Sequence, residues 1–327
     1  RSRAYPRDDM SNDERRMNTP ARPAQIVVVG ACNTDLVSYV PRLPALGETL
    51  HGVRFQAGFG GKGANQAVMA AKLGARVTMI GKLGRDVFGA DYRAHLAALG
   101  INTDYVHMTD AASSGVAPIA VDAEGRNAII IVMGANDLLT QDEIETARAA
   151  ISAADVVVGQ LEIPLDITMA VLRMARHAGV RTILNPAPAK PSLPDECYAL
   201  SDIFCPNENE TALLTGMPVD TLAACERAGR ELLRRGAGTV ILTLGARGSL
   251  IVTADDTLHV AARAVHAVDS TGAGDAFVGS LACFLGEGMA LAAAVRAAGA
   301  IATLSVLKPG AQSSFPTRAE ARESCMS

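Results

Sequence analysis

The run Gln25-Ile26-Val27-Val28-Val29 decides the class of fold, because it is short, rich in β-branched residues and apolar beyond its first position. A strand with one face in water alternates apolar and polar residues, whereas a strand covered on both faces stays apolar throughout. Residues 155–159, with the sequence DVVVG, show the same pattern. We therefore expect a buried sheet of parallel strands.

From Gln25 onward, short β-rich segments alternate with helical segments, which is typical of a parallel sheet wound by helices. The other predicted strands are residues 77–80, 156–158, 182–184, 203–205 and 240–243. The predicted helices are residues 64–73, 89–99, 141–152, 167–177, 208–214, 222–233 and 276–285. The fold class is thus α/β, with an open, mostly parallel β-sheet and helices on both of its faces.

Two segments interrupt this alternation. Residues 34–58 and 115–132 are predicted to be extended chain with no helix between their strands, the second a hairpin closed by the turn at 122–125. Both follow strands whose carboxyl ends should face the ligand crevice of a wound sheet. They form either an edge decoration of the sheet or a small antiparallel β-sheet lid over the crevice, and we favour the lid.

A single large domain accounts for most of the 327 residues. Residues 1–22, rich in Arg, Asp, Asn and Pro, are expected to be a disordered N-terminal extension. Residues 23–317 are expected to form the folded domain, and residues 318–327 a C-terminal tail.

Composition excludes several classes of function. A net charge of −4, no Trp and only 4% aromatic residues argue against nucleic-acid binding, which needs basic surface and stacking rings. The longest stretch without Asp, Glu, Lys or Arg is residues 23–34, shorter than the roughly 20 apolar residues of a membrane span. The six cysteines include no CxxC pair, so we expect reduced thiols and a cytoplasmic, or alternatively nuclear, protein.

The segment Asp269-Ser270-Thr271-Gly272-Ala273-Gly274-Asp275 precedes an apolar helix and carries the clearest chemistry. Glycines before a helix let backbone N–H groups converge on an anion at the positive helix end. Asp275, in the first turn, would take a proton from a hydroxyl while those groups hold a phosphoryl group. The alternative is an ordinary helix entry with an acidic residue in its first turn.

A second glycine cluster, residues 58–66 with the sequence GFGGKGANQ, opens the helix at 64–73. It lacks the Walker A spacing, and no GxGxxG follows the first strand. Lys62 and Asn65 would donate to the oxygens of a polyhydroxylated ligand, although a flexible loop with a solvated lysine is the plainer alternative.

Other polar residues follow predicted strands. Asn33 and Asp35 come directly after the first strand, and Glu162 after the strand near 156–161. These side chains suit vicinal hydroxyls, or else bond their own turns. Asn207 and Glu210 are either a helix capping box or a polar pair near Mg²⁺ and phosphate. Residues 243–248, TLGARG, form either a nucleotide-contacting turn or a plain hairpin.

The order of GACNTD at 30–35, GGKGANQ at 60–66, NxxE at 207–210, TLGARG at 243–248 and DSTGAGD at 269–275 resembles the ribokinase family of sugar kinases. The resemblance covers residues 25–316. It implies a ribokinase-like kinase domain with a small β-sheet lid, and ATP-dependent phosphorylation of ribose at its 5-hydroxyl. Ser270 stands where the family more often has Thr.

The resemblance also implies roles for individual residues. Asp275 matches the general base, and Gly272, Ala273 and Gly274 match the anion hole. The positions that match sugar-binding residues are Asn33, Asp35, Gly61, Lys62, Asn65 and Glu162, together with Asp275. The positions that match nucleotide-binding residues are Asn207, Thr243, Gly245, Gly248 and Gly274.

Two ions are implied as cofactors in the same way. Glu210 matches a residue that acts on Mg²⁺ through water. The positions that match ligands of K⁺ are Asp269, Thr271, Ser305, Lys308, Gly310 and Ser314, several of them through backbone carbonyls. The implied partners are ribose, ATP and a second copy of the chain, in a homodimer formed through the lid, with no nucleic acid and no membrane.

Competing functions remain at this level. A nucleoside kinase should bracket a base with aromatic side chains, yet the lid segments contain only Tyr39 and Phe55, with Phe59 at their edge. A phosphofructokinase should add cationic groups for the phosphate of its substrate, and none is identified near residues 33–65. A catalytically silent sugar-binding protein on the same fold is the third alternative, which the presence of Asp275 disfavours.

Overall fold

The computed structural model describes residues 22–326, and within this range it contains one large sheet and one small one. The large sheet has nine strands in the order β13-β12-β11-β10-β9-β8-β1-β4-β5. Strands β12 and β13 run antiparallel to their neighbours, and all the other pairings in this sheet are parallel. The predicted α/β class with an open, mostly parallel sheet is confirmed.

The elements follow one another along the chain with short connections. The strands of the large sheet are β1 (Gln25–Val29), β4 (Arg76–Gly84), β5 (Asn102–Thr109), β8 (Val156–Gly159), β9 (Arg181–Leu184), β10 (Ile203–Phe204), β11 (Thr239–Thr243), β12 (Ser249–Val252) and β13 (Thr257–Val260). The helices are α2 (Lys62–Lys72), α3 (Val87–Ala98), α4 (Gln141–Thr146), α5 (Arg148–Ala153), α6 (Leu165–His177), α7 (Asp195–Ala199), α8 (Glu208–Thr215), α9 (Leu222–Arg234), α10 (Ala273–Gly286), α11 (Leu291–Ser305) and α12 (Arg318–Met326).

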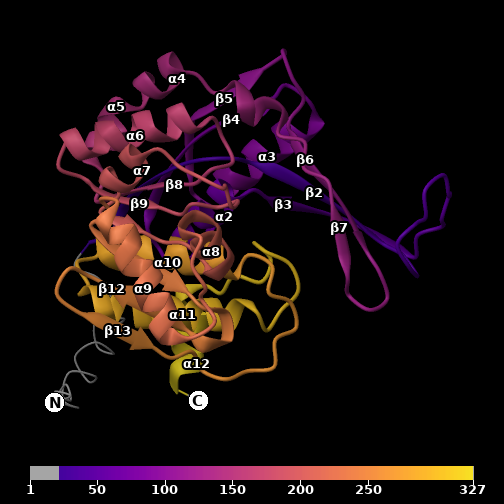
Figure 1. Ribbon diagram of the computed structural model, residues 1–327. Helices are drawn as coiled ribbons and strands as arrows, with labels where there is room; N and C mark the ends of the chain where they lie inside the picture. The colour runs from indigo at the N-terminus through magenta and orange to yellow at the C-terminus, as the bar shows by residue number, and fades with distance from the viewer. Residues whose placement is uncertain (1–21, 327) are drawn as a thin grey trace.

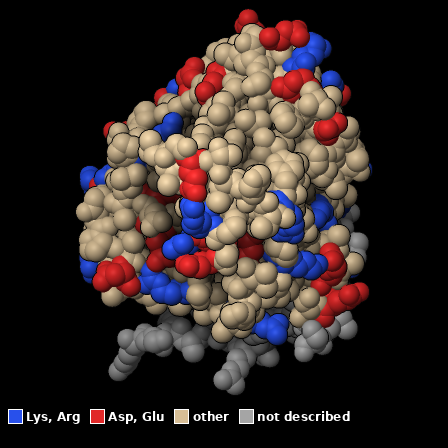
Figure 2. Space-filling view, turned by 90° about the vertical axis from the view of Figure 1, so that its right-hand side faces the viewer, with Lys and Arg blue, Asp and Glu red and all other residues tan. Residues whose placement is uncertain are grey.

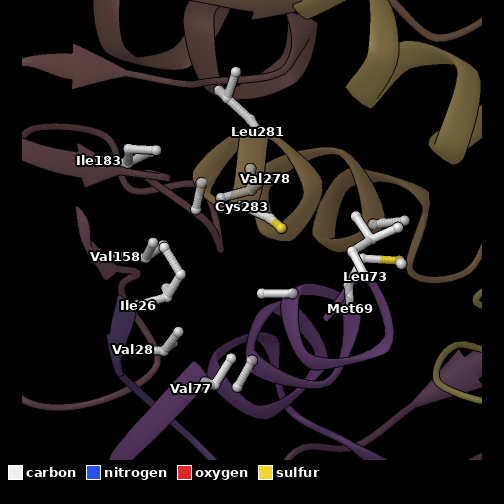
Figure 3. Packing of buried hydrophobic residues seen from close by; sticks show 14 of the residues in the cluster. Ile26, Val28, Met69, Leu73, Val77, Val158, Ile183, Val278, Leu281 and Cys283 are labelled. Atoms are coloured by element: carbon white, nitrogen blue, oxygen red, sulfur yellow. The ribbon is translucent and has the colours of Figure 1, made fainter. Parts of the chain in front are cut away.

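Two apolar layers cover the two faces of the large sheet. Figure 3 shows Ile26 and Val28 of β1 on the side of Met69 from α2 and Val278 from α10. The alternate residues of β1, Val27 and Val29, belong to the opposite layer, which includes α4, α5, α6 and α9. This explains the unbroken apolar run of β1, because both rows of its side chains lose contact with water.

The small sheet projects from the body as an arm (Figure 1). Its strands, in the order β3-β2-β6-β7, are β2 (Asn33–Tyr39), β3 (Arg54–Gly60), β6 (Gly115–Val121) and β7 (Asn127–Ile129). Each predicted insertion forms an antiparallel pair, but β2 and β6 join the two pairs in parallel, which differs from the wholly antiparallel lid expected. The reason is that β2 follows β1 and β6 follows β5, so both strands lead outward from the carboxyl ends of parallel strands.

Several elements differ from the sequence prediction. The helix expected at 141–152 is divided at Ala147, where the Thr146 hydroxyl donates to the Glu143 carbonyl and the Ala147 N–H turns to Ile144. Strands β5, β12 and β13 and helices α7, α11 and α12 are additional. Residues 318–326, assigned above to a tail, thus contain a helix. The predicted extension lies outside the described residues except for Arg22, which forms an ion pair with Asp155.

Two further features bear on the expectations from composition. None of the helices within residues 22–326 has the length and hydropathy needed to cross a bilayer. The five cysteines whose side chains the structure describes, Cys32, Cys197, Cys205, Cys225 and Cys283, are buried and unpaired.

Candidate functional site

Asp275 lies at the N-terminal end of α10, in the first turn, and its side chain is only 6% exposed. Both carboxylate oxygens accept hydrogen bonds from α2. Asn65 Nδ2 donates to Oδ2 and Gln66 Nε2 donates to Oδ1, each at 2.9 Å. These two hydrogen bonds fix the orientation of the Asp275 carboxyl group, as a general base requires.

Two further carboxyl groups gather near Asp275. Glu162 accepts a hydrogen bond from the Lys62 backbone N–H at 2.8 Å, and burial raises its pKa. Asp35 has its pKa raised to about 6, first by burial and then by the charges of Glu162 and Asp275. The pKa of Lys62 is raised chiefly by Asp275, so this lysine stays charged among the carboxylates. The group offers several acceptors and one cation to a hydroxylated ligand.

The other residues matched to the sugar site lie at the roots of the lid. Asn33 opens β2 and pairs with Gly60, the last residue of β3. Gly61 has φ +88°, and a Cβ there would lie 2.7 Å from the Ala31 carbonyl oxygen and from the Asn33 amide nitrogen. Only glycine allows α2 to begin this close to the end of β1. The structure therefore brings the predicted sugar-site residues together at one edge of the sheet.

Figure 2 shows the charge distribution on the face from which the lid projects. Acidic side chains lie at the floor of a hollow, and Lys and Arg side chains surround it. Phosphates would meet positive charge near the entrance, while the hydroxyl acceptors lie deeper.

The turn before α10 is tightly packed. Gly272 has φ +77°, and a Cβ there would lie 2.9 Å from the Cβ of Ala311 and 3.2 Å from the Phe315 ring. A larger residue would push the turn away from the segment that carries Ala311. Of the backbone groups predicted as an anion hole, the Ala273 N–H already donates to the Ser270 carbonyl at 3.2 Å.

A pocket of about 1450 Å³ adjoins this turn. Its lining includes every position that was matched to nucleotide binding, namely Asn207, Thr243, Gly245, Gly248 and Gly274. Residues 243–249 form the hairpin between β11 and β12, and this hairpin also lines the pocket. Gly274, the neighbour of Asp275, is one of the lining residues, so the pocket comes close to the Asp275 turn.

Asn207 and Glu210 form a capping box at the start of α8. Asn207 accepts from the Glu210 N–H at 2.8 Å, and Glu210 accepts from the Asn207 N–H at 2.8 Å. Burial raises the pKa of Glu210. Within residues 22–326 no three His, Cys, Asp or Glu side chains cluster as a metal site. Glu210 offers one carboxyl group to a Mg²⁺ ion, which commonly keeps several waters and binds substrate phosphates.

The two segments matched to the K⁺ site lie against each other. Asp269 Oδ1 accepts from the Thr271 N–H at 2.9 Å, and Oδ2 accepts from the Gly310 N–H at 2.8 Å. The Val306 carbonyl accepts from the N–H groups of Val268 and Asp269. Carbonyl and hydroxyl oxygens suit a monovalent cation. Ser305 ends α11, and Lys308 and Ser314 lie with Gly310 in the loop that follows it.

Sequence reasoning missed a set of buried amides behind these residues. Asn136, Gln160 and Gln312 each donate to the side-chain oxygen of a residue that faces the site. Asn136 Nδ2 donates to Asn33, Gln160 Nε2 to Gln66, and Gln312 Nε2 to Asn65, at distances of 2.9, 2.7 and 2.9 Å. The donor amides are at most 6% exposed. The only sequence signal for Gln160 is its place directly after the apolar run of β8.

Comparison with known proteins agrees with this geometry. The family model of the pfkB family of carbohydrate kinases matches residues 23–318. Mouse (Mus musculus) ribokinase is 45% identical over 307 residues, covering 91% of this chain and 95% of that protein. A deoxyribokinase of Salmonella typhi is 42% identical over 293 residues, covering 89% and 95%.

Among solved structures, Arabidopsis thaliana ribokinase complexed with ribose and ATP superposes with a TM-score of 0.85 at 33% identity. The match covers 92% of this chain and 98% of that one. The family match spans both the Asp275 site and the adjoining pocket. This chain therefore belongs to the pfkB family of carbohydrate kinases.

Proposed function

We propose that this protein transfers the γ-phosphoryl group of ATP to the 5-hydroxyl of D-ribose, giving ribose 5-phosphate and ADP. The observation that carries the proposal is the position of Asp275, which lies among the hydroxyl acceptors and next to Gly274 of the large pocket. The ribokinases among its relatives, one of them complexed with ribose and ATP, support the choice of substrates.

Asp275 acts as the general base in this proposal. It takes the proton of the 5-hydroxyl as the oxygen bonds to the γ-phosphorus and the bond from that phosphorus to the β–γ bridging oxygen breaks. The backbone N–H groups of residues 272–274 face the charge that develops on the transferring group. The Ala273 N–H must leave Ser270 to take part, so the turn rearranges slightly when nucleotide binds.

The sugar is held by side chains of complementary polarity. Asp35 and Glu162 accept hydrogen bonds from the hydroxyl groups of ribose, and Lys62 donates to the hydroxyl oxygens of ribose. Asn136 donates a hydrogen bond to the Asn33 side-chain oxygen, and the Asn33 Nδ2 group is then the donor available to ribose. Asn65 and the backbone at Gly61 complete the proposed sugar site, and the lid closes over it.

Two ions complete the proposed enzyme. Glu210 would hold Mg²⁺ through water beside the ATP phosphates, where the ion neutralises phosphate charge. K⁺ would lie between the 269–271 segment and residues 305–314, and would fix the backbone next to the anion hole. ATP itself would occupy the pocket lined by Asn207, Thr243, Gly245, Gly248 and Gly274.

We further propose that residues 23–317 are the kinase domain, that two copies associate through their lids, and that the protein is cytoplasmic. Exposed apolar side chains on the lid support association, since Phe55 and Ile129 are 63% and 51% exposed. The described cysteines are unpaired, as expected in a reducing compartment.

The decisive experiment measures ADP release from ATP with Mg²⁺ and K⁺ present, across ribose, 2-deoxyribose, fructose 6-phosphate, adenosine and other sugars. We expect the highest kcat/KM with ribose, with phosphate on the 5-hydroxyl of the product by ³¹P NMR. The panel includes 2-deoxyribose because deoxyribokinases are 42% identical to this chain. Sugar binding without turnover of any substrate would instead indicate a silent binding protein.

A further inference from the structure

We propose that Gln312 is a positioning residue for phosphoryl transfer, because it fixes the Asn65 amide in the orientation that keeps an N–H donor on Asp275. This inference rests on the proposed function, in which Asp275 is the base. Gln312 lies outside the glycine motifs, in the segment between α11 and α12, and touches neither the Asp275 carboxylate nor the large pocket.

The orientation of Gln312 is determined by a backbone group. The Tyr92 hydroxyl donates to the Gly60 carbonyl at 2.5 Å, and a carbonyl can only accept. The Tyr92 oxygen is thus left to accept, and it accepts from Gln312 Nε2 at 3.0 Å. On its other side, Gln312 Oε1 lies 2.9 Å from His95 Nε2. The nitrogen of Gln312 is therefore directed toward Tyr92 and Asn65.

This direction is transmitted to the base. Gln312 Nε2 also donates to Asn65 Oδ1 at 2.9 Å, so the opposite end of the Asn65 amide presents its nitrogen to Asp275 Oδ2. Reversing the Asn65 amide would place two donors face to face at Gln312 and two oxygens face to face at Asp275. Tyr92, Gln312 and Asn65 are at most 6% exposed, so water would not relieve either conflict.

The side chain of Gln312 can be separated from the position of its backbone. Lys72 Nζ donates to the carbonyl oxygens of Gln312 and Phe315, at 2.8 and 2.9 Å, and so anchors the same segment independently. Lys72→Met loosens this anchor but leaves the Gln312–Asn65 hydrogen bond in place. It is the matched control for an effect that comes from the segment and not from the amide.

The charged groups that act on Asp275 are Lys62, Asp35, Glu162 and Glu210. Gln312→Met alters none of them, and the titratable side chain beside it is His95. Without the donor of Gln312, the Asn65 amide is free to turn its oxygen toward Asp275. Loss of an N–H donor raises the pKa of a carboxyl group, so Asp275 should protonate at higher pH.

The test titrates Asp275 in the unliganded protein by carboxyl ¹³C NMR, with the resonance assigned by its loss in Asp275→Asn. We expect Gln312→Met to raise the pKa of Asp275 by roughly one unit, the equivalent of one hydrogen bond. The acidic limb of kcat/KM for ribose should move in the same direction. Lys72→Met should lower the melting temperature and leave both quantities unchanged.

A double-variant cycle completes the design. In an Asn65→Ala background, Gln312→Met should produce no further shift, because nothing remains for Gln312 to orient. An unshifted Asp275 in Gln312→Met, an equal shift in Lys72→Met, or additive shifts in the double variant would overturn the proposal. If Gln312→Met does not fold, Gln312→Leu, which also lacks a donor and adds no charge, is used with the same expectation. The NMR titration needs no sugar, so its failure is distinct from a failure of ribose to react.

Discussion

The side-chain amides of Asn65 and Gln66 present only N–H donors to Asp275. This limits the residues that can replace Asp275. Any substitute with an NH₂ group brings a donor against a donor.

The substitution Asp275→Asn tests whether Asp275 is the general base. The amide keeps the shape of the side chain and removes the base, so we expect phosphoryl transfer to fall by roughly 10² to 10⁴-fold. Ribose binding, measured by calorimetry, should be largely retained. Thermal unfolding serves as the control, because the new donor conflict lowers stability slightly. Activity within a few-fold of the parent would rule out Asp275 as the base.

Asp35 provides a second prediction, on substrate selection. Asp35→Ala removes an acceptor of hydroxyl hydrogens, and a hydroxyl left without its partner costs about 1–3 kcal/mol. Ribose affinity should therefore fall far more than ATP affinity when both are measured by calorimetry. Equal losses for the two ligands would point to a disturbed fold.

The same residue should make ribose binding depend on pH. In the unliganded protein the pKa of Asp35 is raised to about 6, mainly by burial, and ribose that donates hydroxyl hydrogens prefers the ionised form. Ribose affinity is therefore greatest above pH 6 and falls as the pH drops through 6. Asp35→Asn should flatten this dependence, apart from the part due to Glu162, whose pKa is also raised.

How far the sequence predicts the site depends on the kind of residue. Asp275, Asn65 and Asp35 are recognisable because they lie beside glycine turns or strand ends, where local pattern indicates a ligand. Gln312, Asn136 and Gln160 are not, because their importance comes from partners distant in the chain. Gln312 and Asn65, for example, are 247 positions apart. No local pattern encodes such a contact.

At the scale of elements, the contact between the 268–271 segment and the loop after α11 supports a prediction on cations. Asp269 joins the two through the Gly310 N–H, next to the turn at Gly272 where we propose the anion hole. A cation held between them would order donors aimed at developing charge. We expect K⁺ to raise turnover and lower the KM for ATP, and Na⁺ to do so poorly. Equal rates in choline, NaCl and KCl at matched ionic strength would show that this chain has no such site.

Helix α12 gives a prediction on stability. The Arg318 guanidinium donates to the Leu73 carbonyl and pairs with Glu287, whose side chain is only 4% exposed. Arg318→Ala leaves that carboxylate buried and unpaired, which costs about 3–5 kcal/mol. The loss should appear as a lower urea midpoint at constant slope. Glu287→Gln in the Arg318→Ala background should recover part of the loss, because the side chain left without its partner is then uncharged.

Three of the elements that the sequence missed, β5, β13 and α11, share a physical cause. Strands β5 and β13 are only partly buried, so they lack the unbroken apolar runs of β1 and β8. Helix α11, with the sequence LAAAVRAAGAIATLS, has small apolar residues on nearly every face, which weakens the helical period. In these three elements the apolar pattern is too weak for sequence analysis to recognise a strand or a helix.

At the scale of the whole molecule, the lid leaves apolar side chains in water. We expect the protein to be a dimer by light scattering, with Ile129→Asp shifting it toward monomer. Leu213→Asp on α8, where the side chain is 45% exposed against 51% for Ile129, should leave the mass unchanged. A parent protein that remains monomeric at all concentrations would exclude association through the lid.

The burial of the cysteines has a practical consequence for following the lid in real time. Burial raises the pKa of Cys32 to about 12 and also raises those of Cys197, Cys205, Cys225 and Cys283, so these thiols remain protonated and slow to react. Leu46, between β2 and β3, is fully exposed. With Cys325 replaced by Ser, a cysteine introduced at position 46 would accept a fluorophore selectively, and the lid would then report sugar occupancy as an optical signal.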